Sequence, residues 1–503
     1  MKAFIAKCKK VKIVSLFALI LVIMMLLPVF TACKKAPIVI NSDTTVIGTE
    51  TADPTAETLQ QDDLPELNYQ NQDITFLAWN QSTTEYYADE NSADNVENAV
   101  YSRNVKVENR LNVNLNFIEM DGNSSSFNDF CASAVISIES GTADYDAIAC
   151  YSRSAGVLTL KGVLGDLMDT EYLNFSQPWW PSSLLEHNTI NDSLYFMSGD
   201  IATSLIYQLT FMIANNNLID EMNMSDPQQL AIDGDWTLEA MNQMCTGVYS
   251  DLNSDGTKSI EDKYGLVISS HTLMDLFFIG SGITYISSDT DGSLMLSDNY
   301  FTDKTYSLIE DLNTLLWSSN DGIYNKSFNT AIMASGTSLF YVLLGSSLAS
   351  ADFRNSEFDY SILPSPKYDS TQEDYYTTVG FPHSMYCIPV DAIDKDMSSA
   401  VMECMASESY RTVTPVLFDT EFKYKYSNSE NDAKMFEIIR STVVFDIGRI
   451  FFDTLGGDAS SPTRVLRLQL ENNTNTLASS SAKYKLVWNK ALEGIMTSIQ
   501  GLS

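Results

Sequence analysis

The chain has 503 residues, and its 65 Asp and Glu outnumber its 30 Lys and Arg to give a net charge of −35. This acidity excludes nucleic acid as a partner, because phosphate binding needs a basic surface. The length exceeds what one ordinary hydrophobic core supports, so two lobes are expected.

The first 33 residues have the pattern of a secretory signal. Five lysines (Lys2, Lys7, Lys9, Lys10 and Lys12) precede an apolar run from Ile13 to Phe30, and Thr31, Ala32 and Cys33 follow. This order is typical of a positively charged start, a membrane-inserting segment and a small residue at the cleavage site. Residues 1–32 are therefore predicted to be a signal peptide. The alternative is a retained transmembrane anchor, since 18 apolar residues can just span a bilayer.

The end of this signal resembles a bacterial lipobox, in which cleavage leaves the cysteine as the first residue and its sulfur carries a lipid. Phe30 stands where leucine is usual. The resemblance implies that Cys33 is lipidated, palmitate included, and tethers the protein to the outer side of the cell membrane. Residues 33–67 are rich in Thr, Ala, Asp, Pro and Gln and are predicted to be a flexible linker.

Cysteine usage adds little. Cys8 leaves with the signal and Cys33 is the lipid site, so five cysteines remain: Cys131, Cys150, Cys245, Cys387 and Cys404. Their number is odd, and no disulfide framework or metal-binding spacing is visible.

The folded part begins with alternating strands and helices. Strands are predicted at residues 74–79, 113–118 and 145–150, and helices at 95–111 and 127–139. Alternation of this kind favours right-handed crossovers and a largely parallel sheet. Ligands of such sheets bind beyond the carboxyl ends of the strands. That rule indicates Trp79 and Asn80 after the first strand, and Tyr151 and Ser152 after the third.

Further segments give a family resemblance. Pro178-Trp179-Trp180, residues 211–218, and Trp236-Thr237 occur in the order seen in extracellular solute-binding proteins of family 1, the lipid-anchored receptors of ABC importers for sugars and oligosaccharides. The segment Phe-Asp-Tyr-Ser-Ile-Leu-Pro-Ser-Pro-Lys at 358–367, with Gln372, Tyr375 and Tyr376 behind it, is similar to the return strand of that family. Trp236 is interpreted as structural, whereas Trp179 and Trp180 fit a stacking wall or a core equally well.

The resemblance implies an α/β fold of two lobes, the type II periplasmic-binding-protein-like fold, with a mainly parallel sheet flanked by helices in each lobe and a hinge between them. Lobe 1 is predicted to comprise residues 68–208 and 358–405, and lobe 2 residues 209–357 and 406–503. Closure of the lobes would bury the ligand. Gln208, near the first crossing, and Tyr341 and His383, in the second lobe and the returning segment, complete the candidate ligand-binding residues.

An acidic loop at 251–262 has calcium-site spacing. Asp251, Asn253 and Asp255 occupy positions 1, 3 and 5, the carbonyl of Thr257 position 7, and Asp262 position 12. Calcium prefers such oxygen ligands, and a glycine at position 6 permits the sharp turn. We expect a structural Ca²⁺ ion here; the alternative is a solvated Asn/Asp/Gly turn.

Catalytic motifs are scarce. The three histidines form no zinc motif, and no nucleophile elbow, Walker loop or dinucleotide fingerprint is present. No catalytic residue is predicted, and the function expected is a monomeric, non-enzymatic receptor that captures a carbohydrate and delivers it to an ABC permease. The alternatives are a surface-anchored glycan hydrolase, since a carboxylate pair could exist in space, and a glycan-binding adhesin outside transport.

Overall fold

The computed structural model describes residues 59–289, 292–422 and 430–501, all of them in the unit that begins at Leu59. The predicted signal peptide and Cys33 lie outside the described residues. Within these ranges, no helix combines the length and apolar character needed to cross a membrane.

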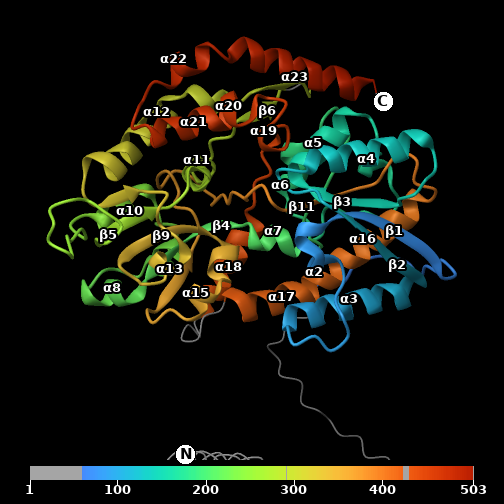
Figure 1. The fold of residues 1–503 in the computed structure, drawn as a ribbon, viewed down its shortest axis with the longest axis horizontal. Helices are drawn as coiled ribbons and strands as arrows, with labels where there is room; N and C mark the ends of the chain where they lie inside the picture. The colour runs from blue at the N-terminus through green and yellow to red at the C-terminus, as the bar shows by residue number, and fades with distance from the viewer. Residues whose placement is uncertain (1–58, 290–291, 423–429, 502–503) are drawn as a thin grey trace, which may run out of the picture. The chain divides into compact units, whose positions relative to one another are not determined.

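The first sheet has four strands in the order β11-β3-β1-β2. β1 pairs in parallel with both β2 and β3, and β11 pairs antiparallel with β3. Figure 1 shows that β11 comes from a distant part of the chain, between the yellow and orange stretches, although it joins blue and cyan neighbours. The elements are β1 (Gln72–Trp79), α2 (Thr83–Tyr86), α3 (Asn95–Leu111), β2 (Val113–Met120), α4 (Phe127–Ser140), β3 (Ala147–Tyr151), α5 (Ser152–Leu160), α6 (Ser183–Asn188), α7 (Thr203–Tyr207), β11 (Ser384–Cys387) and α16 (Lys395–Glu408).

The strands and helices predicted for residues 74–150 are confirmed, because their local signals agree with the packing. In α3, the Asp94 side chain caps the helix by accepting from the amides of Val96 and Glu97. Val96, Val100, Val107 and Leu111 form its buried face. Asn112 ends the helix in the left-handed conformation at φ 53°.

The second sheet has five strands in the order β10-β4-β9-β5-β8. β5 pairs in parallel with β8 and β9, whereas β4 pairs antiparallel with β9 and β10. The sheet is thus evenly mixed rather than mainly parallel. Its strands and the helices around them are β4 (Thr210–Asn215), α8 (Asn216–Glu221), α9 (Pro227–Asp233), α10 (Leu238–Cys245), β5 (Tyr264–Ile268), α11 (Asp275–Gly280), α12 (Asp303–Asn313), β8 (Gly322–Tyr324), α13 (Thr330–Met333), β9 (Ser338–Leu344), α14 (Gly345–Leu348), α15 (Ala351–Arg354), β10 (Tyr360–Leu363) and α18 (Glu430–Ser441).

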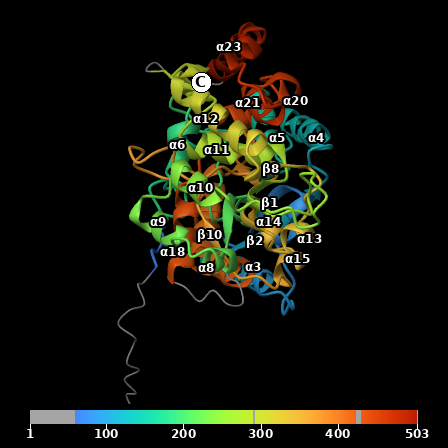
Figure 2. The ribbon, with the colours of Figure 1, turned by 90° about the vertical axis from the view of Figure 1, so that its left-hand side faces the viewer.

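The C-terminal part is helical and reaches both lobes. α19 contacts α5 of the first lobe, and α23 contacts both α5 and the hairpin strand β7. Figure 2 shows the red helices α20, α21 and α23 in the upper part of the view. The remaining elements are β6 (Ile286–Ser288), β7 (Leu294–Leu296), α17 (Thr414–Leu417), α19 (Ile447–Ile450), α20 (Gly457–Ser460), α21 (Pro462–Glu471), α22 (Leu477–Ala482) and α23 (Lys485–Gln500).

Three segments that pass between the lobes pair with one another, and we call them the hinge segments: residues 208–210, 377–380 and 442–444. The amide of Gly380 donates to the carbonyl of Gln208 at 2.7 Å. On the other side, the amide of Thr377 donates to Thr442 and its carbonyl accepts from Val444, both at 2.8 Å. The lobes are therefore joined by a narrow strip of hydrogen-bonded main chain.

Three predicted boundaries were wrong. Lobe 2 was predicted to resume at residue 406, but α17 still packs on α3 of the first lobe. Residues 358–363 were placed in lobe 1, but β10 pairs with β4 in the second sheet, so the chain returns to the first lobe only after Leu363. Residues 59–67 were assigned to the linker, yet Asp62 is bound by Arg110 of α3 at 2.7 Å and by the Ser407 hydroxyl of α16 at 2.7 Å. An acidic residue in a polar stretch gave no sign of these distant partners.

The tandem tryptophans are core residues. Trp179 and Trp180 are buried, and each indole N–H donates to the Glu403 carboxylate at 2.9 Å. Glu403 lies on α16, so this clamp fastens the segment before α6 to the first lobe. Burial of Glu403, against the opposing effect of the two indoles, raises its pKa to about 7. Trp236 is also buried and donates to the Pro364 carbonyl at 3.0 Å, which confirms its structural assignment.

Glu403 makes stability depend on pH. A carboxyl whose pKa is raised in the folded state holds its proton more tightly there. The stability that Glu403 contributes to the folded state is therefore fully present below a pH of about 4.5 and is lost as the pH rises through 7. The unfolding free energy of the wild type relative to Glu403→Gln should fall by on the order of 3 kcal/mol between these limits. Urea denaturation at several pH values measures it. For the control Glu139→Gln, at the exposed end of α4, the difference in unfolding free energy from the wild type should not change with pH. A difference for Glu403→Gln that also stays constant with pH would contradict the raised pKa of Glu403.

Candidate functional site

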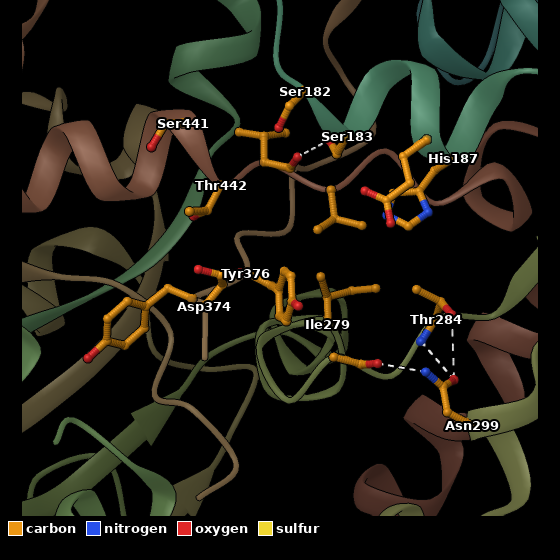
Figure 3. A pocket seen from close by; sticks show the side chains of 15 residues that line it. Ser182, Ser183, His187, Ile279, Thr284, Asn299, Asp374, Tyr376, Ser441 and Thr442 are labelled. Atoms are coloured by element: carbon orange, nitrogen blue, oxygen red, sulfur yellow. Dashed lines mark hydrogen bonds between the residues drawn. The ribbon is translucent and has the colours of Figure 1, made fainter. Parts of the chain in front are cut away.

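A large cavity lies where the hinge segments meet the two lobes. Its volume is about 580 Å³, within the range of roughly 300–1,000 Å³ that small-molecule sites occupy. Figure 3 shows polar side chains from several elements converging on it. The lining residues are Ser182, Ser183, Glu186, His187, Ile279, Gly282, Thr284, Asn299, Asp374, Tyr375, Tyr376, Ser441, Thr442, Val443 and Val444.

The floor of the cavity consists of hinge segments and their neighbours. Residues 374–376 run directly into Thr377, and residues 441–444 run alongside it through the hydrogen bonds described above. The same main chain therefore joins the lobes and lines the cavity. A change of hinge angle must alter the cavity.

The first wall is α6. The Ser183 hydroxyl donates to the Val443 carbonyl, and the Asn188 amide donates to the Phe445 carbonyl at 3.0 Å. These bonds fix α6 against the floor, where Glu186 and His187 line the cavity. Figure 3 shows the His187 ring at its edge. Burial lowers the pKa of His187, so its imidazole is neutral at pH 7.

The second wall is the turn after α11. Asn299 holds this turn in place, because its amide nitrogen donates to the Gly282 carbonyl at 2.7 Å and its oxygen accepts from the Thr284 amide at 3.1 Å. Both polar ends of the Asn299 side chain are thus engaged (Figure 3). Asn299 positions the wall, and Ile279 adds an apolar surface to it.

Tyr376 stands between the walls with a half-buried ring. Burial and the negative charges of Asp374 and Glu186 raise the pKa of its hydroxyl, which therefore stays protonated. With the hydroxyls of Ser182, Ser441 and Thr442 around the ring, the cavity offers one aromatic face and several hydrogen-bonding groups. That combination suits a flat ligand with many hydroxyls.

The structure places the predicted ligand residues elsewhere. Trp79 and Tyr151 are almost fully buried, their rings lie 5.4 Å apart, and the Trp79 indole donates to the Ser384 hydroxyl at 2.8 Å. Tyr341 is buried in β9, where its hydroxyl accepts from the Ser338 amide at 2.8 Å. These three side chains belong to the cores of the two lobes.

Ser152 and His383 do come together, but around a space of only about 10 Å³. The Ser152 hydroxyl donates to the Phe381 carbonyl at 2.6 Å, and His383 Nδ1 lies 2.7 Å from the Gly380 carbonyl oxygen. Burial, with a contribution from nearby Arg449, lowers the pKa of His383 to about 4. A space of this size holds one water molecule and no sugar.

The last two predicted ligand residues lie apart from each other. Asn80 is exposed and donates to Asp121 at 2.5 Å, whereas Gln208 belongs to a hinge segment. None of the seven lines the large cavity. Tyr375 and Tyr376 do line it; both stood in the return-strand motif, and that motif was the sequence signal that could have located the site.

The acidic loop at 251–262 forms the turn expected of a calcium site. Gly256, at position 6, has φ +72°, and the Asp251 carboxylate accepts from its amide at 2.8 Å. Asp262 is fully buried, and one oxygen of each of these two carboxylates is buried without a hydrogen-bond partner. No group of three or more His, Cys, Asp or Glu side chains among the described residues is arranged to hold a metal. An ion here would need the carboxylates of Asp251, Asp255 and Asp262 to move closer together, with the Asn253 side chain and the Thr257 carbonyl completing its ligands.

No protein-family model matches the sequence, and no curated protein matches it. Solved structures do match. They include the extracellular solute-binding protein from Staphylococcus aureus in complex with maltose (TM-score 0.52, 11% identity, 88% of this chain and 100% of that one). The cyclic α-maltosyl-1,6-maltose binding protein from Arthrobacter globiformis has a TM-score of 0.52 at 10% identity, with 84% and 99% covered.

A third match is an ABC transporter solute-binding protein from Thermotoga lettingae bound with α-D-tagatose (TM-score 0.50, 14% identity, 84% and 100% covered). All three are described as binding proteins. The likeness confirms the two-lobe α/β fold, which this chain shares with these solute-binding proteins. The likeness shows the fold alone. The ligand of this chain has to be inferred from its own cavity.

Trp79→Ala should destabilise the protein by about 3–5 kcal/mol, because it removes a large buried ring and leaves a cavity. Urea denaturation followed by circular dichroism measures the loss. Trp317→Ala, at a tryptophan that is 41% exposed, should cost much less. Unchanged stability of Trp79→Ala would show instead that the ring lies on a free surface.

Proposed function

We propose that this protein is the substrate-binding component of an ABC importer, located on the outer side of the cell membrane, that captures a carbohydrate. The cavity of about 580 Å³ with hinge segments as its floor is the observation that carries the proposal. An oligosaccharide of a few units fits the multiple hydroxyls and the single exposed ring face. The fold shared with sugar-binding proteins supports the same function.

Binding proceeds by closure of the hinge. α6 and the Gly282 to Thr284 turn belong to different lobes, so rotation about the hinge segments changes the width between them. A sugar ring stacked on Tyr376 contacts both walls and favours the closed form, because closure removes its apolar face from water. The closed form is the one that a permease would take the ligand from.

The proposal includes membrane attachment through a lipid on Cys33, which the lipobox resemblance implies. A lipid on Cys33 would hold the binding protein near a permease in the same membrane, which raises the effective concentration of the complex. Mass spectrometry of the mature N-terminus tests this part independently of ligand binding.

Tyr376→Ala should weaken binding of a cognate sugar by about tenfold, since stacking on an aromatic ring contributes roughly 0.5–1.5 kcal/mol. A thermal-shift screen of mono- and oligosaccharides identifies the sugar, and isothermal titration calorimetry measures the dissociation constant. Tyr101→Ala, at a half-buried tyrosine of α3 outside the cavity, is the matched control and should bind normally.

Binding and product measurements with the same sugars separate the receptor from the hydrolase and the adhesin. Stabilisation without product supports the receptor, and release of reducing sugar would support a glycan hydrolase. Binding to an insoluble glycan, with no response to soluble sugars, would favour an adhesin.

We also propose that the 251–262 loop binds a structural Ca²⁺ ion. Asp251, Asn253, Asp255 and Asp262 would supply side-chain oxygens and Thr257 its carbonyl. The buried, unpartnered oxygens of Asp251 and Asp262 support this, because a buried carboxylate oxygen without a partner is costly. The ion would offset the repulsion among these carboxylates.

Removal of calcium with a chelator should lower the stability of the protein by about 2.7 kcal/mol relative to calcium at one hundred times its dissociation constant. Differential scanning fluorimetry measures the accompanying fall in Tm. Asp262→Asn should abolish the calcium response, whereas Asp220→Asn, at an exposed position of α8, should retain it. A wild-type Tm that does not change with calcium would overturn the proposal.

A further inference from the structure

The large cavity carries negative charge that nothing around it balances. Glu186 on α6 and Asp374 on the floor both line it, and none of the described lining residues is lysine or arginine. The two carboxylates belong to different elements, and both line the cavity together with Tyr376. The surface of the cavity is therefore negatively charged.

Neighbouring cations do not cancel this charge. Arg440, next to the lining residue Ser441, is already paired with Asp200 at 2.8 Å and with Glu437 at 2.9 Å. His187, beside Glu186, is kept neutral at pH 7 by burial. Neither the Glu186 nor the Asp374 carboxylate forms a hydrogen bond or an ion pair with another of the described residues. Both are free to meet a ligand.

Closure of the lobes lets the negative charge of the cavity select among ligands. As water leaves the cavity, each carboxylate loses solvation and needs a partner in its place. A ligand that carries a uronate, sulfate or phosphate would bring a like charge into a space of falling dielectric constant. A protonated amine would instead supply opposite charge and three hydrogen-bond donors.

We propose that Glu186 and Asp374 select a sugar that bears a free, protonated amino group, and that they exclude anionic sugars. The proposal rests on the carbohydrate-binding function argued above and names the class of sugar. Specificity then has an attractive part, amine with carboxylate, and a repulsive part, carboxylate against anion.

The test compares three disaccharides of similar size at pH 7, where the His187 imidazole is neutral. They are the β-1,4 dimers of glucosamine and of N-acetylglucosamine, and digalacturonate. The wild type should bind the glucosamine dimer about tenfold more tightly than its N-acetyl counterpart, and this ratio should shrink at high salt. Digalacturonate should not bind. Isothermal titration calorimetry provides the dissociation constants.

Charge-neutral variants locate the effect. Glu186→Gln and Asp374→Asn should each reduce the preference for the amine several-fold, while the affinity for the N-acetyl dimer changes little. Both side chains are exposed, so the variants should fold, and thermal unfolding checks that they do. Glu239→Gln removes one exposed charge on α10, away from the cavity, and should leave the preference intact.

The two proposals fail in different ways. Equal affinity for the amine and its N-acetyl form, or binding of digalacturonate, overturns the charge selection while sugar binding itself stands. A preference that survives in both cavity variants also overturns it. If no mono- or oligosaccharide of any charge binds, the carbohydrate-binding function fails, and the charge selection fails with it.

Discussion

The whole arrangement depends on the hydrogen bonds among the hinge segments. Gln208 with Gly380, and Thr377 with Thr442 and Val444, join three passages of the chain that are far apart in sequence. Each lobe has its own sheet, so these few main-chain bonds set how the lobes meet. Because the same segments form the floor of the cavity, lobe geometry and ligand geometry cannot vary independently. A binding protein that responds to its ligand needs this coupling.

The C-terminal segment explains why the cavity lies at the hinge and away from the strand ends of the first sheet. α19 packs on α5 so closely that a Cβ at Gly156 would lie 2.5 Å from the Ile450 carbonyl. Arg153 donates to Asp453 at 2.6 Å, and buried Asp275 binds Arg449 and Arg467. These buried charges are paired, as burial requires. Together the contacts fill the region where the strand-end rule predicts a ligand.

Local sequence patterns predicted an element correctly where the pattern lies within the element itself. The apolar face of α3, the apolar runs of β1 and β3 and the alternation in β2 predicted these elements, and they form where predicted. Contacts between residues far apart in the chain could not be predicted from the sequence. The contacts of Asp62 with Arg110 and of β10 with β4 moved two of the wrong boundaries, because a strand's own periodicity does not show which strand it will pair with.

The sequence by itself determined the fold class and the order of the first-lobe elements, since periodicity acts over a few residues. It also indicated an export signal and a family resemblance through the order of short motifs. It also contained Tyr375 and Tyr376 without showing that they face a cavity. Only the tertiary structure decided which polar residues meet. Ser182, Glu186, Asp374 and Ser441 come from distant parts of the chain, and the crossing of the hinge segments brings them to one space. Which side chains surround a ligand depends on packing over long separations, and no local pattern encodes it.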